Sequence, residues 1–269
     1  MAKKRGMSSE HASSVKISGH QNEHDFAQLI GGHVNPSDHQ DKRDVIDSQL
    51  EPHSVKGGSY WQIFLYSRNR IVNNTMFKGI GNIKKIMLRC IDSYPDNFED
   101  YQNDKLASKI RLQEPMRFLR EELSNENILC AFLDKGLFDG GNAKYLSIFL
   151  GETKAHINDK VFHVFHKNDV INSLIKNISV NNSKAKNKNQ TDDQKVVFFS
   201  NLVGKNGKNI GEIEDRHDSA QHYREIKFRL HAEPTYSILN QSIETRKRLC
   251  RQLVIYGKAG KTFKPNIKS

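Results

Sequence analysis

Cysteine is scarce in this sequence, and its spacing argues against disulfide chemistry. The three cysteines among 269 residues, Cys90, Cys130 and Cys250, lie far apart and form no C-x-x-C pair. An odd number of widely spaced cysteines does not make a disulfide framework. We therefore expect a reducing compartment in which the thiols stay free and are buried.

Long hydrophobic runs are also missing. No apolar segment approaches the ~18–20 residues that a membrane-spanning helix requires. The first twenty residues contain no apolar core of the kind found in signal peptides. These absences predict a cytoplasmic protein without a membrane partner. Residues 1–19 are polar and show no apolar periodicity, so we expect them to form a mobile arm.

Acidic residues are too few to balance the basic ones. The chain has 42 Lys and Arg against 31 Asp and Glu, which gives a formal net charge of +11. A strongly basic chain favours a polyanionic partner, and nucleic acid fits better than a membrane surface. From Arg246 to the end there is no acidic residue, so this part is expected to contribute to non-specific nucleic-acid binding.

One stretch places acidic and basic residues on two neighbouring strands. Asp44-Val45-Ile46-Asp47 predicts a short strand, a turn follows, and His53-Ser54-Val55-Lys56 predicts a second strand. The segment Gly57-Gly58-Ser59 then opens a predicted helix over residues 61–72. A carboxylate that faces a lysine across a hairpin can hold a divalent cation beside a group that activates water. The hairpin is therefore the candidate active centre.

Strand alternation separates the side chains of this hairpin. In a regular strand Asp44 and Ile46 face one way and Asp47 faces the other way. We expect Asp44 to face the site, whereas Asp47 begins the turn. On the second strand Ser54 and Lys56 share a face.

A helix is predicted just before the hairpin, over residues 20–30. Phe26, Leu29 and Ile30 form its apolar stripe, and two glycines end it. Glu23 lies three residues before Phe26 and shares the inward side of the helix. Its carboxylate either faces a metal ion or serves as an ordinary helix-start residue, and both interpretations stay open.

These motifs resemble the PD-(D/E)XK nuclease superfamily and, within it, the type II restriction endonucleases. Asp44 matches the aspartate that begins one strand. Ser54-Val55-Lys56 matches the acidic-x-Lys triplet of the next strand, except that its first residue is neutral. Gln62 and Tyr66 resemble the Q-x-x-x-Y element of RecB-like members. The segment Asn22-Glu23-His24-Asp25-Phe26-Ala27 is similar to the first helix of the family core.

The resemblance covers residues 20–72 and carries implications for fold, cofactor and site. It implies an α/β fold with a restriction-endonuclease-like core, in which helices flank a mixed central sheet. It also implies Mg²⁺ as the cofactor, and a lysine that orients or deprotonates the attacking water. The implied catalytic residues are Asp44, Lys56, Glu23 and Ser54; the implied metal ligands are Asp44, the Val55 carbonyl and Glu23; Gln62 and Tyr66 have implied secondary roles.

The same resemblance implies a type II site-specific deoxyribonuclease of prokaryotic origin that cuts double-stranded DNA. Cleavage of both strands at a symmetric site implies a homodimer, and a restriction role implies a cognate DNA methyltransferase as genetic partner. Two other functions remain open. One is a repair or junction nuclease of the same fold, and the other is a DNA-binding protein in which Ser54 marks a decayed site.

The remainder of the chain is expected to complete a single α/β nuclease domain over residues 20–269. Residues 76–150 predict a helical insertion, and Asn- and Lys-rich residues 181–195 predict a mobile surface loop. Residues 161–166 predict a strand, and a helix is predicted from Tyr236 to about Val254.

The C-terminal third contains the best candidate for a DNA-reading strand. In the segment 223–231, Ile226, Phe228 and Leu230 share an apolar face, whereas the other face is basic and aromatic. Such a face could contact phosphates or base edges. The predicted DNA-binding residues are Arg216, Tyr223, Arg224, Lys227 and Arg229.

A rival centre lies in the same third of the chain. Glu225-Ile226-Lys227 is a literal acidic-x-Lys triplet, and Asp215 and Asp218 precede it. The N-terminal hairpin is favoured because an acidic helix precedes it and the Q-x-x-x-Y segment follows it. The segment Gly260-Lys261-Thr262 resembles the end of a P-loop, but too few residues follow it for the required helix.

Overall fold

The chain divides into two compact units, as a computed structural model shows. The structure describes residues 9–36, 42–73, 75, 77–151, 157–186, 190–202, 204 and 207–267. Unit 1 comprises Met1–Ser59, Gly141–Val170 and Asn240–Ser269, and unit 2 comprises Tyr60–Gly140 and Ile171–Leu239. Each unit is built from separate stretches of chain, and the single α/β nuclease domain expected over residues 20–269 stays a prediction.

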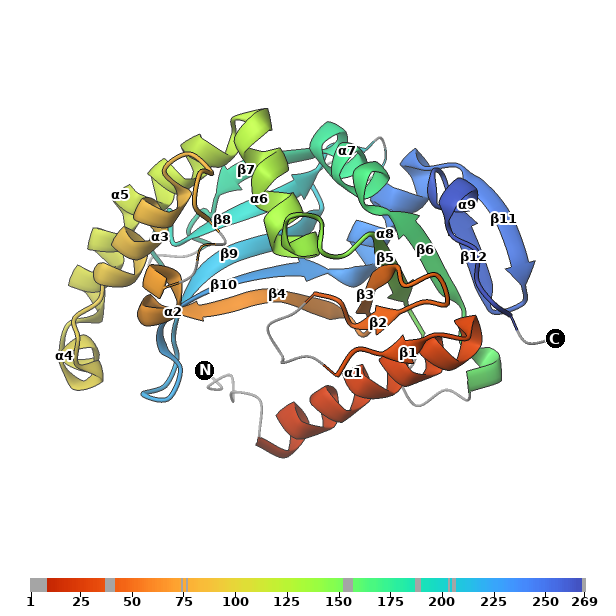
Figure 1. The fold of residues 1–269 in the computed structure, drawn as a ribbon. Helices are drawn as coiled ribbons and strands as arrows, with labels where there is room; N and C mark the ends of the chain where they lie inside the picture. Colours follow the sequence, from red (N-terminus) through yellow and green to blue (C-terminus); the bar gives the residue numbers. More distant parts are fainter. Residues whose placement is uncertain are drawn as a thin grey trace. The chain divides into compact units, whose positions relative to one another are not determined.

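A mixed seven-stranded sheet forms the centre of unit 1, in the order β1-β2-β3-β5-β6-β12-β11 (Figure 1). The β3–β5 and β6–β12 pairs are parallel, and the other neighbours are antiparallel. Helices α1 (Ser9–Ile30) and α9 (Ala259–Thr262) contribute to one core with this sheet. The strands are β1 (His33–Val34), β2 (Val45–Ile46), β3 (Pro52–Lys56), β5 (Tyr145–Phe149), β6 (Phe162–His166), β11 (Thr245–Cys250) and β12 (Leu253–Tyr256).

An antiparallel five-stranded sheet forms the centre of unit 2, in the order β4-β10-β9-β8-β7. Helices pack on one of its faces, where rings from β4, β10 and α6 meet (Figure 1). The strands are β4 (Tyr60–Ser67), β7 (Ile178–Asn182), β8 (Lys195–Ser200), β9 (Asn209–His217) and β10 (Tyr223–His231). The helices are α2 (Arg68–Asn73), α3 (Ile83–Asp92), α4 (Phe98–Asn103), α5 (Lys105–Leu123) and α6 (Glu126–Phe138).

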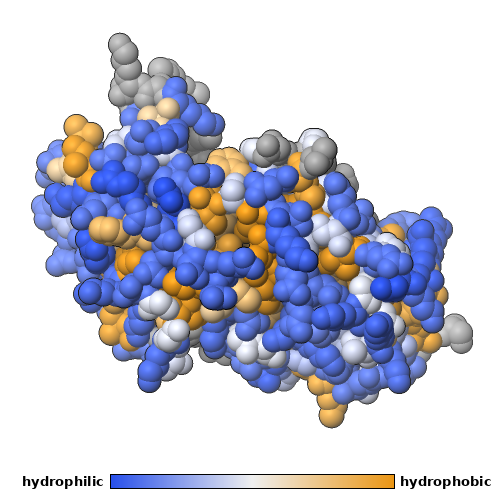
Figure 2. All heavy atoms as spheres, turned by 90° about the horizontal axis from the view of Figure 1, so that it is seen from above, coloured by the Kyte–Doolittle hydropathy of each residue, from blue (hydrophilic) through white to orange (hydrophobic). Residues whose placement is uncertain are grey.

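The remaining elements join these sheets along the chain. Helix α7 (Lys167–Asn177) follows β6, and α8 (Ala232–Ser242) follows β10. Two short 3-10 helices, η1 (Asp139–Gly141) and η2 (Ile157–Asp159), precede β5 and β6. On the face shown in Figure 2, hydrophilic residues cover much of the surface and hydrophobic residues show between them, as the high charged content of the sequence leads one to expect.

Several elements predicted from the sequence are confirmed. The hairpin of β2 and β3 is antiparallel, with Val45 opposite His53. Strand β6 covers the predicted segment 161–166, and β10 matches the predicted strand 223–231. The apolar face of β10 is buried as predicted, because Ile226, Phe228 and Leu230 are at most 1% exposed.

Three predicted helices are wrong in part. Residues 61–72 form strand β4 and the short helix α2 rather than one helix. The helix expected from Tyr236 to about Val254 ends at Ser242, and the strands β11 and β12 follow it. The helical insertion expected over 76–150 stops at Phe138, since β5 is a fully buried strand in the middle of the unit 1 sheet. A buried strand and a buried helix have the same apolar composition, which explains why the apolar segment of β5 was predicted to be helical.

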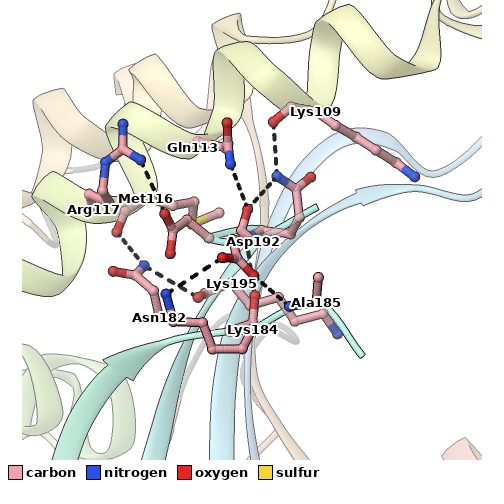
Figure 3. Close-up of polar contacts among 12 residues, drawn as sticks. Lys109, Gln113, Met116, Arg117, Asn182, Lys184, Ala185, Asp192 and Lys195 are labelled. Atoms are coloured by element: carbon pink, nitrogen blue, oxygen red, sulfur yellow. Dashed lines mark hydrogen bonds and ion pairs between the residues drawn. The ribbon is translucent and has the colours of Figure 1, made fainter. Parts of the chain in front are cut away.

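The N-terminal helix and the loop after β7 also differ from expectation. Helix α1 begins at Ser9, well before the predicted start, so part of the predicted arm is helical. The loop expected to be mobile over 181–195 contacts α5 in its described residues (Figure 3). Gln113 donates a hydrogen bond to the Asp192 carbonyl at 3.2 Å, and Arg117 pairs with Asp193 at 3.1 Å. These contacts hold the described part of the loop against α5.

Candidate active site

The hairpin of β2 and β3 brings Asp44 and Lys56 together. The Asp44 amide donates to the His53 carbonyl at 2.8 Å, which fixes Asp44 at the start of its strand. The Lys56 ammonium lies 3.0 Å from Asp44 Oδ2, and both side chains are largely buried, with 15% and 17% of their surface exposed. The predicted pairing of an aspartate with a lysine across the hairpin is present in the structure.

Asp44 Oδ2 accepts two further hydrogen bonds from β3, the strand that carries Lys56. The Val55 amide donates to it at 2.7 Å, and the Ser54 hydroxyl donates to it at 3.4 Å. The Lys56 ammonium also donates to the Val55 carbonyl at 3.0 Å. Ser54 is fully buried, so its hydroxyl serves the Asp44 carboxylate and does not face solvent. The predicted shared face of Ser54 and Lys56 is consistent with their common partner.

Helix α1 places Glu23 within electrostatic reach of this hairpin. Burial raises the pKa of the Glu23 carboxyl, and the negative charge of Asp44 raises it further. A hydrogen bond to His20 at 3.1 Å and the charge of Lys56 act in the opposite direction. Glu23 therefore interacts electrostatically with both Asp44 and Lys56, and its role in facing a metal ion stays a prediction.

The oxygen atoms around Asp44 suit a magnesium ion. Among the described residues, no three or more His, Cys, Asp or Glu side chains form a group that could hold a metal ion. Asp44, Glu23 and the Val55 carbonyl offer two carboxylates and one backbone oxygen. Oxygen ligands are the kind that Mg²⁺ prefers, and Mg²⁺ typically keeps several waters, so these three groups are the candidates for the expected ion. A cation there would also offset the repulsion between the two carboxylates that raises the pKa of Glu23.

Asp47 serves the turn, as predicted. Its Oδ1 accepts hydrogen bonds from the amides of Gln49 and Glu51, both at 2.8 Å. These bonds and one from His53 lower the pKa of the Asp47 carboxyl, although burial acts against them. Asp44 is therefore the aspartate of the site, and Asp47 is a structural residue.

Sequence reasoning missed a polar network behind the hairpin. His53 Nδ1 lies 2.9 Å from the Ser147 hydroxyl, and His53 Nε2 lies 3.4 Å from Asp47 Oδ2. A carboxylate can only accept, so Nε2 carries the proton and Nδ1 accepts from Ser147. The set has the composition of a Ser-His-Asp triad, but all three residues are at most 1% exposed, and no substrate reaches the serine. The network fastens β3 to β5.

A buried lysine holds the helix that carries Glu23. Lys160 is fully buried, and its ammonium donates to Asp25 at 2.6 Å and to Asn22 at 2.8 Å. A buried charge requires partners of this kind, because an unpaired one is very costly. Nothing in the sequence distinguished Lys160 from the other lysines, since its partners lie more than a hundred residues away.

Gln62 and Tyr66 do not share a helical side. Both belong to β4 in unit 2, and Ile63 has no partner where β4 and β10 shift register between Gln62 and Phe64. This bulge reverses the alternation, so that Tyr66 is buried whereas Gln62 is exposed. The helical Q-x-x-x-Y element expected from the resemblance is therefore wrong, and a secondary role for these two residues stays a prediction.

The rival centre is not assembled. In the hairpin of β9 and β10, Asp215 lies opposite Ile226, whereas Glu225 lies opposite Arg216 and Lys227 opposite Glu214. Residues opposite each other share a face, so Asp215 points away from Glu225 and Lys227. The candidate centre at Asp44 gains support from this contrast.

The predicted DNA-binding residues all have partners within unit 2. Burial raises the pKa of the Glu214 carboxyl, but the positive charges of the lysines around it outweigh burial. The resulting pKa is about 2. The basic face of β10 is thus largely neutralised by β9. The contacts are Lys227 to Glu214 at 2.6 Å, Arg229 to Glu212, Arg224 to Asp92 at 2.9 Å and to Asp96, Arg216 to Asp218 at 2.9 Å, and the Tyr223 hydroxyl to the Pro95 carbonyl at 2.8 Å.

Comparison with known proteins gives no family assignment. No protein-family model matches the chain, and no curated protein matches it. Within the part of the chain that the structure describes, no helix is long and apolar enough to span a membrane. The function is therefore argued from the site itself.

Proposed function

We propose that this protein is a Mg²⁺-dependent nuclease that hydrolyses phosphodiester bonds in double-stranded DNA, of the type II restriction endonuclease kind. The observation that carries the proposal is the Asp44–Lys56 pair at 3.0 Å on adjacent strands, with Glu23 beside it. The net charge of +11 supports a polyanionic substrate.

Each residue of the site has a role in the proposed hydrolysis. Asp44, Glu23 and the Val55 carbonyl would hold the metal, and Lys56 would orient the attacking water beside them. The bound ion supplies a Lewis acid that offsets negative charge on the scissile phosphate. Ser54 holds the Asp44 carboxylate through its hydroxyl at 3.4 Å. No covalent intermediate with the protein is required.

The proposal extends to assembly and genetic context. Cleavage of both strands at a symmetric site calls for a two-fold homodimer, because each copy supplies one centre. A restriction enzyme also needs a partner methyltransferase that protects the host DNA. Both statements rest on the proposed function.

Plasmid cleavage tests the proposal. Purified protein should cut supercoiled plasmid with Mg²⁺ or Mn²⁺, and EDTA should stop the reaction. Asp44→Asn and Lys56→Ala should each lower the rate by at least about a hundredfold, because each 1.4 kcal/mol of lost transition-state stabilisation costs tenfold. Both should still bind duplex DNA.

Glu225→Gln is the matched control, because it removes one carboxylate from the rival triplet. It should retain most of the cleavage activity. An inactive Glu225→Gln together with an active Asp44→Asn would move the active site to β10, and no cleavage by the wild-type protein with either metal would refute the nuclease.

A second function is favoured by the small number of ligands. The described residues offer no group of three metal-binding side chains, and Ser54 replaces a carboxylate. A duplex-binding protein without catalysis fits these two facts. Tight duplex binding without cleavage at any metal concentration would support it.

A further inference from the structure

Lys56 and Arg248 lie in one row across the unit 1 sheet. Lys56 is opposite Ile148, Ile148 is opposite His163, His163 is opposite Val254, and Val254 is opposite Arg248. Side chains of directly paired residues project from the same face of a sheet. Lys56 and Arg248 therefore share a face, and four strand spacings separate them by about 19 Å.

The charge of Arg248 acts on the ring of His163 in this row. Burial lowers the pKa of His163, and the positive charge of Arg248 lowers it further, to about 4. A guanidinium that disfavours a second positive charge on the imidazole must lie close to it. The pairing register and the electrostatics thus agree on where Arg248 projects.

Arg251 brings a second guanidinium to the same end of the sheet. Strand β3 ends at Lys56, and the turn between β11 and β12 contains Arg251, next to Cys250. Cys250 is opposite Leu253, and Leu253 is opposite Phe162, at the end of the sheet where β3 stops. The Arg248 guanidinium donates to the Arg251 carbonyl at 3.1 Å, which links the two residues.

Both arginines are available to a ligand. Each is exposed, and neither forms an ion pair with a carboxylate among the described residues. This distinguishes them from the arginines of β9 and β10, which pair with acidic neighbours. The sequence after Glu244 contains no acidic residue that could neutralise them.

We propose that Arg248 and Arg251 form a second anchor for the phosphate backbone of the duplex that occupies the Asp44–Lys56 site. The inference rests on the proposed function and names a binding surface for its substrate. Guanidinium groups bind phosphate oxygens in a two-pronged geometry. A separation of about 19 Å corresponds to about six base pairs at 3.4 Å each, which is within the length of one duplex; between the two places Ile148 and Val254 are buried, so the duplex would pass along the end of the sheet where β3 stops.

A competing explanation is that the charges protect the sheet edge. Strand β11 is the last strand of the unit 1 sheet, and exposed basic side chains on such a strand discourage pairing with another chain. Under this explanation the arginines prevent self-association and do not contact DNA. The two explanations predict different results for the same variants.

The test measures duplex binding as a function of salt, by fluorescence anisotropy, in the cleavage-deficient Asp44→Asn background. Each phosphate contact contributes about 0.9 to the slope of log affinity against log salt. Arg248→Ala and Arg251→Ala should each reduce the slope by about one, and the double variant by about two. Arg248→Lys keeps the charge and should keep the slope.

Arg89→Ala is the matched control. Arg89 is an exposed arginine of unit 2 that pairs with Glu114 at 3.0 Å, so its removal changes the net charge equally without touching the anchor. Its slope should remain that of the parent. An equal loss of slope in Arg89→Ala would show a general charge effect and overturn the inference.

Activity gives a second readout in the otherwise wild-type protein. Backbone contacts far from the scissile phosphate bind substrate and transition state equally, so the double variant should raise KM while kcat changes little. If the variants self-associate while the salt slope of duplex binding and KM stay unchanged, edge protection is established and the anchor is overturned. The proposed nuclease function would stand in that case. Absence of any duplex binding by the parent protein would instead remove the proposed function together with the anchor.

Discussion

Ser54 stands where the PD-(D/E)XK pattern that the hairpin resembles has an acid, and the surroundings of Ser54 explain what an acid there would do. The side chain is fully buried, and its hydroxyl lies 3.4 Å from Asp44 Oδ2. A carboxylate at this position would face Asp44 at close range. Without a cation, burial and like charge would both disfavour ionisation. With a cation, the same pair would supply the missing ligand.

Ser54→Asp should therefore make the stability of the protein depend on Mg²⁺. We expect a lower Tm than wild type in EDTA, and a larger rise in Tm than wild type when Mg²⁺ is added. A ligand at a hundred times its Kd stabilises the folded state by about 2.7 kcal/mol. Thermal unfolding with and without Mg²⁺ measures both. The control is Ser54→Asn, because asparagine has the shape of aspartate without its charge. An equal change in Tm on addition of Mg²⁺ in the two variants would place the metal elsewhere.

Asp215 is a buried carboxyl without a hydrogen-bond partner among the described residues. Burial raises its pKa well above the usual carboxyl range, and the charges of Asp92, Glu214 and Glu225 add to this, whereas Arg224 opposes it. In the unfolded chain the same group titrates near 4. The folded state thus holds a proton that the unfolded state releases, and stability falls as pH rises from about 4 toward the raised pKa.

Asp215→Asn should remove this pH dependence, because the amide does not titrate. We expect the variant to match wild type near pH 4 and to exceed it at pH 8, by about 1.4 kcal/mol for each unit by which the pKa is raised. Urea unfolding at both pH values measures the difference. A stability gap that stays constant with pH would mean that Asp215 is ionised in the folded protein.

Strand alternation predicted which hairpin residues meet, but apolar periodicity failed for long buried segments. The alternation rule separated Asp44 from Asp47 correctly, because the two residues flank the short strand β2 and a defined turn follows Asp47. The helix predicted over the segment of β4 was wrong because the bulge at Ile63 makes buried residues recur at a spacing similar to that of a helix. The basic residues after Glu244 are typical of the last turn of a helix, although this segment forms the edge strand β11.

Contacts between distant parts of the chain were beyond prediction. Lys160 fixes α1 through Asp25 and Asn22, and Ser147 fixes β3 through His53, each across more than ninety residues. Local pattern carries no information on such pairs. The Asp44–Lys56 pair, which lies on one hairpin, was therefore predictable. The distant contacts that hold this hairpin in place were not.

At the scale of the whole molecule, the two units alternate along the chain, so the sequence does not separate them into consecutive segments. Unit 1 consists of three separate stretches of chain, and unit 2 consists of two. The boundaries fall between β3 and β4, before β5, within α7 and within α8. The last two lie inside helices, where no linker marks them, so only the packing reveals these two.

Truncation after Ser242 should unfold unit 1 and spare the core of unit 2. The deletion removes β11, β12 and α9, and with them the core residues Leu253, Ile255 and Phe263, which are at most 4% exposed. Losing these large buried side chains costs about 2–5 kcal/mol each, which together is as much as the 5–15 kcal/mol of stability that a domain typically has. Unit 2 lies wholly before this point.

Calorimetry of the truncated chain should consequently show one remaining transition, of lower total enthalpy than that of the full chain. Truncation after Ile267 is the control, because it keeps every residue that the structure describes up to that point. Duplex binding should be lost with the Ser242 truncation, since both the Asp44–Lys56 site and the Arg248–Arg251 anchor belong to unit 1. A Ser242 truncation that still unfolds with the full enthalpy would show that the last three elements are not part of the unit 1 core.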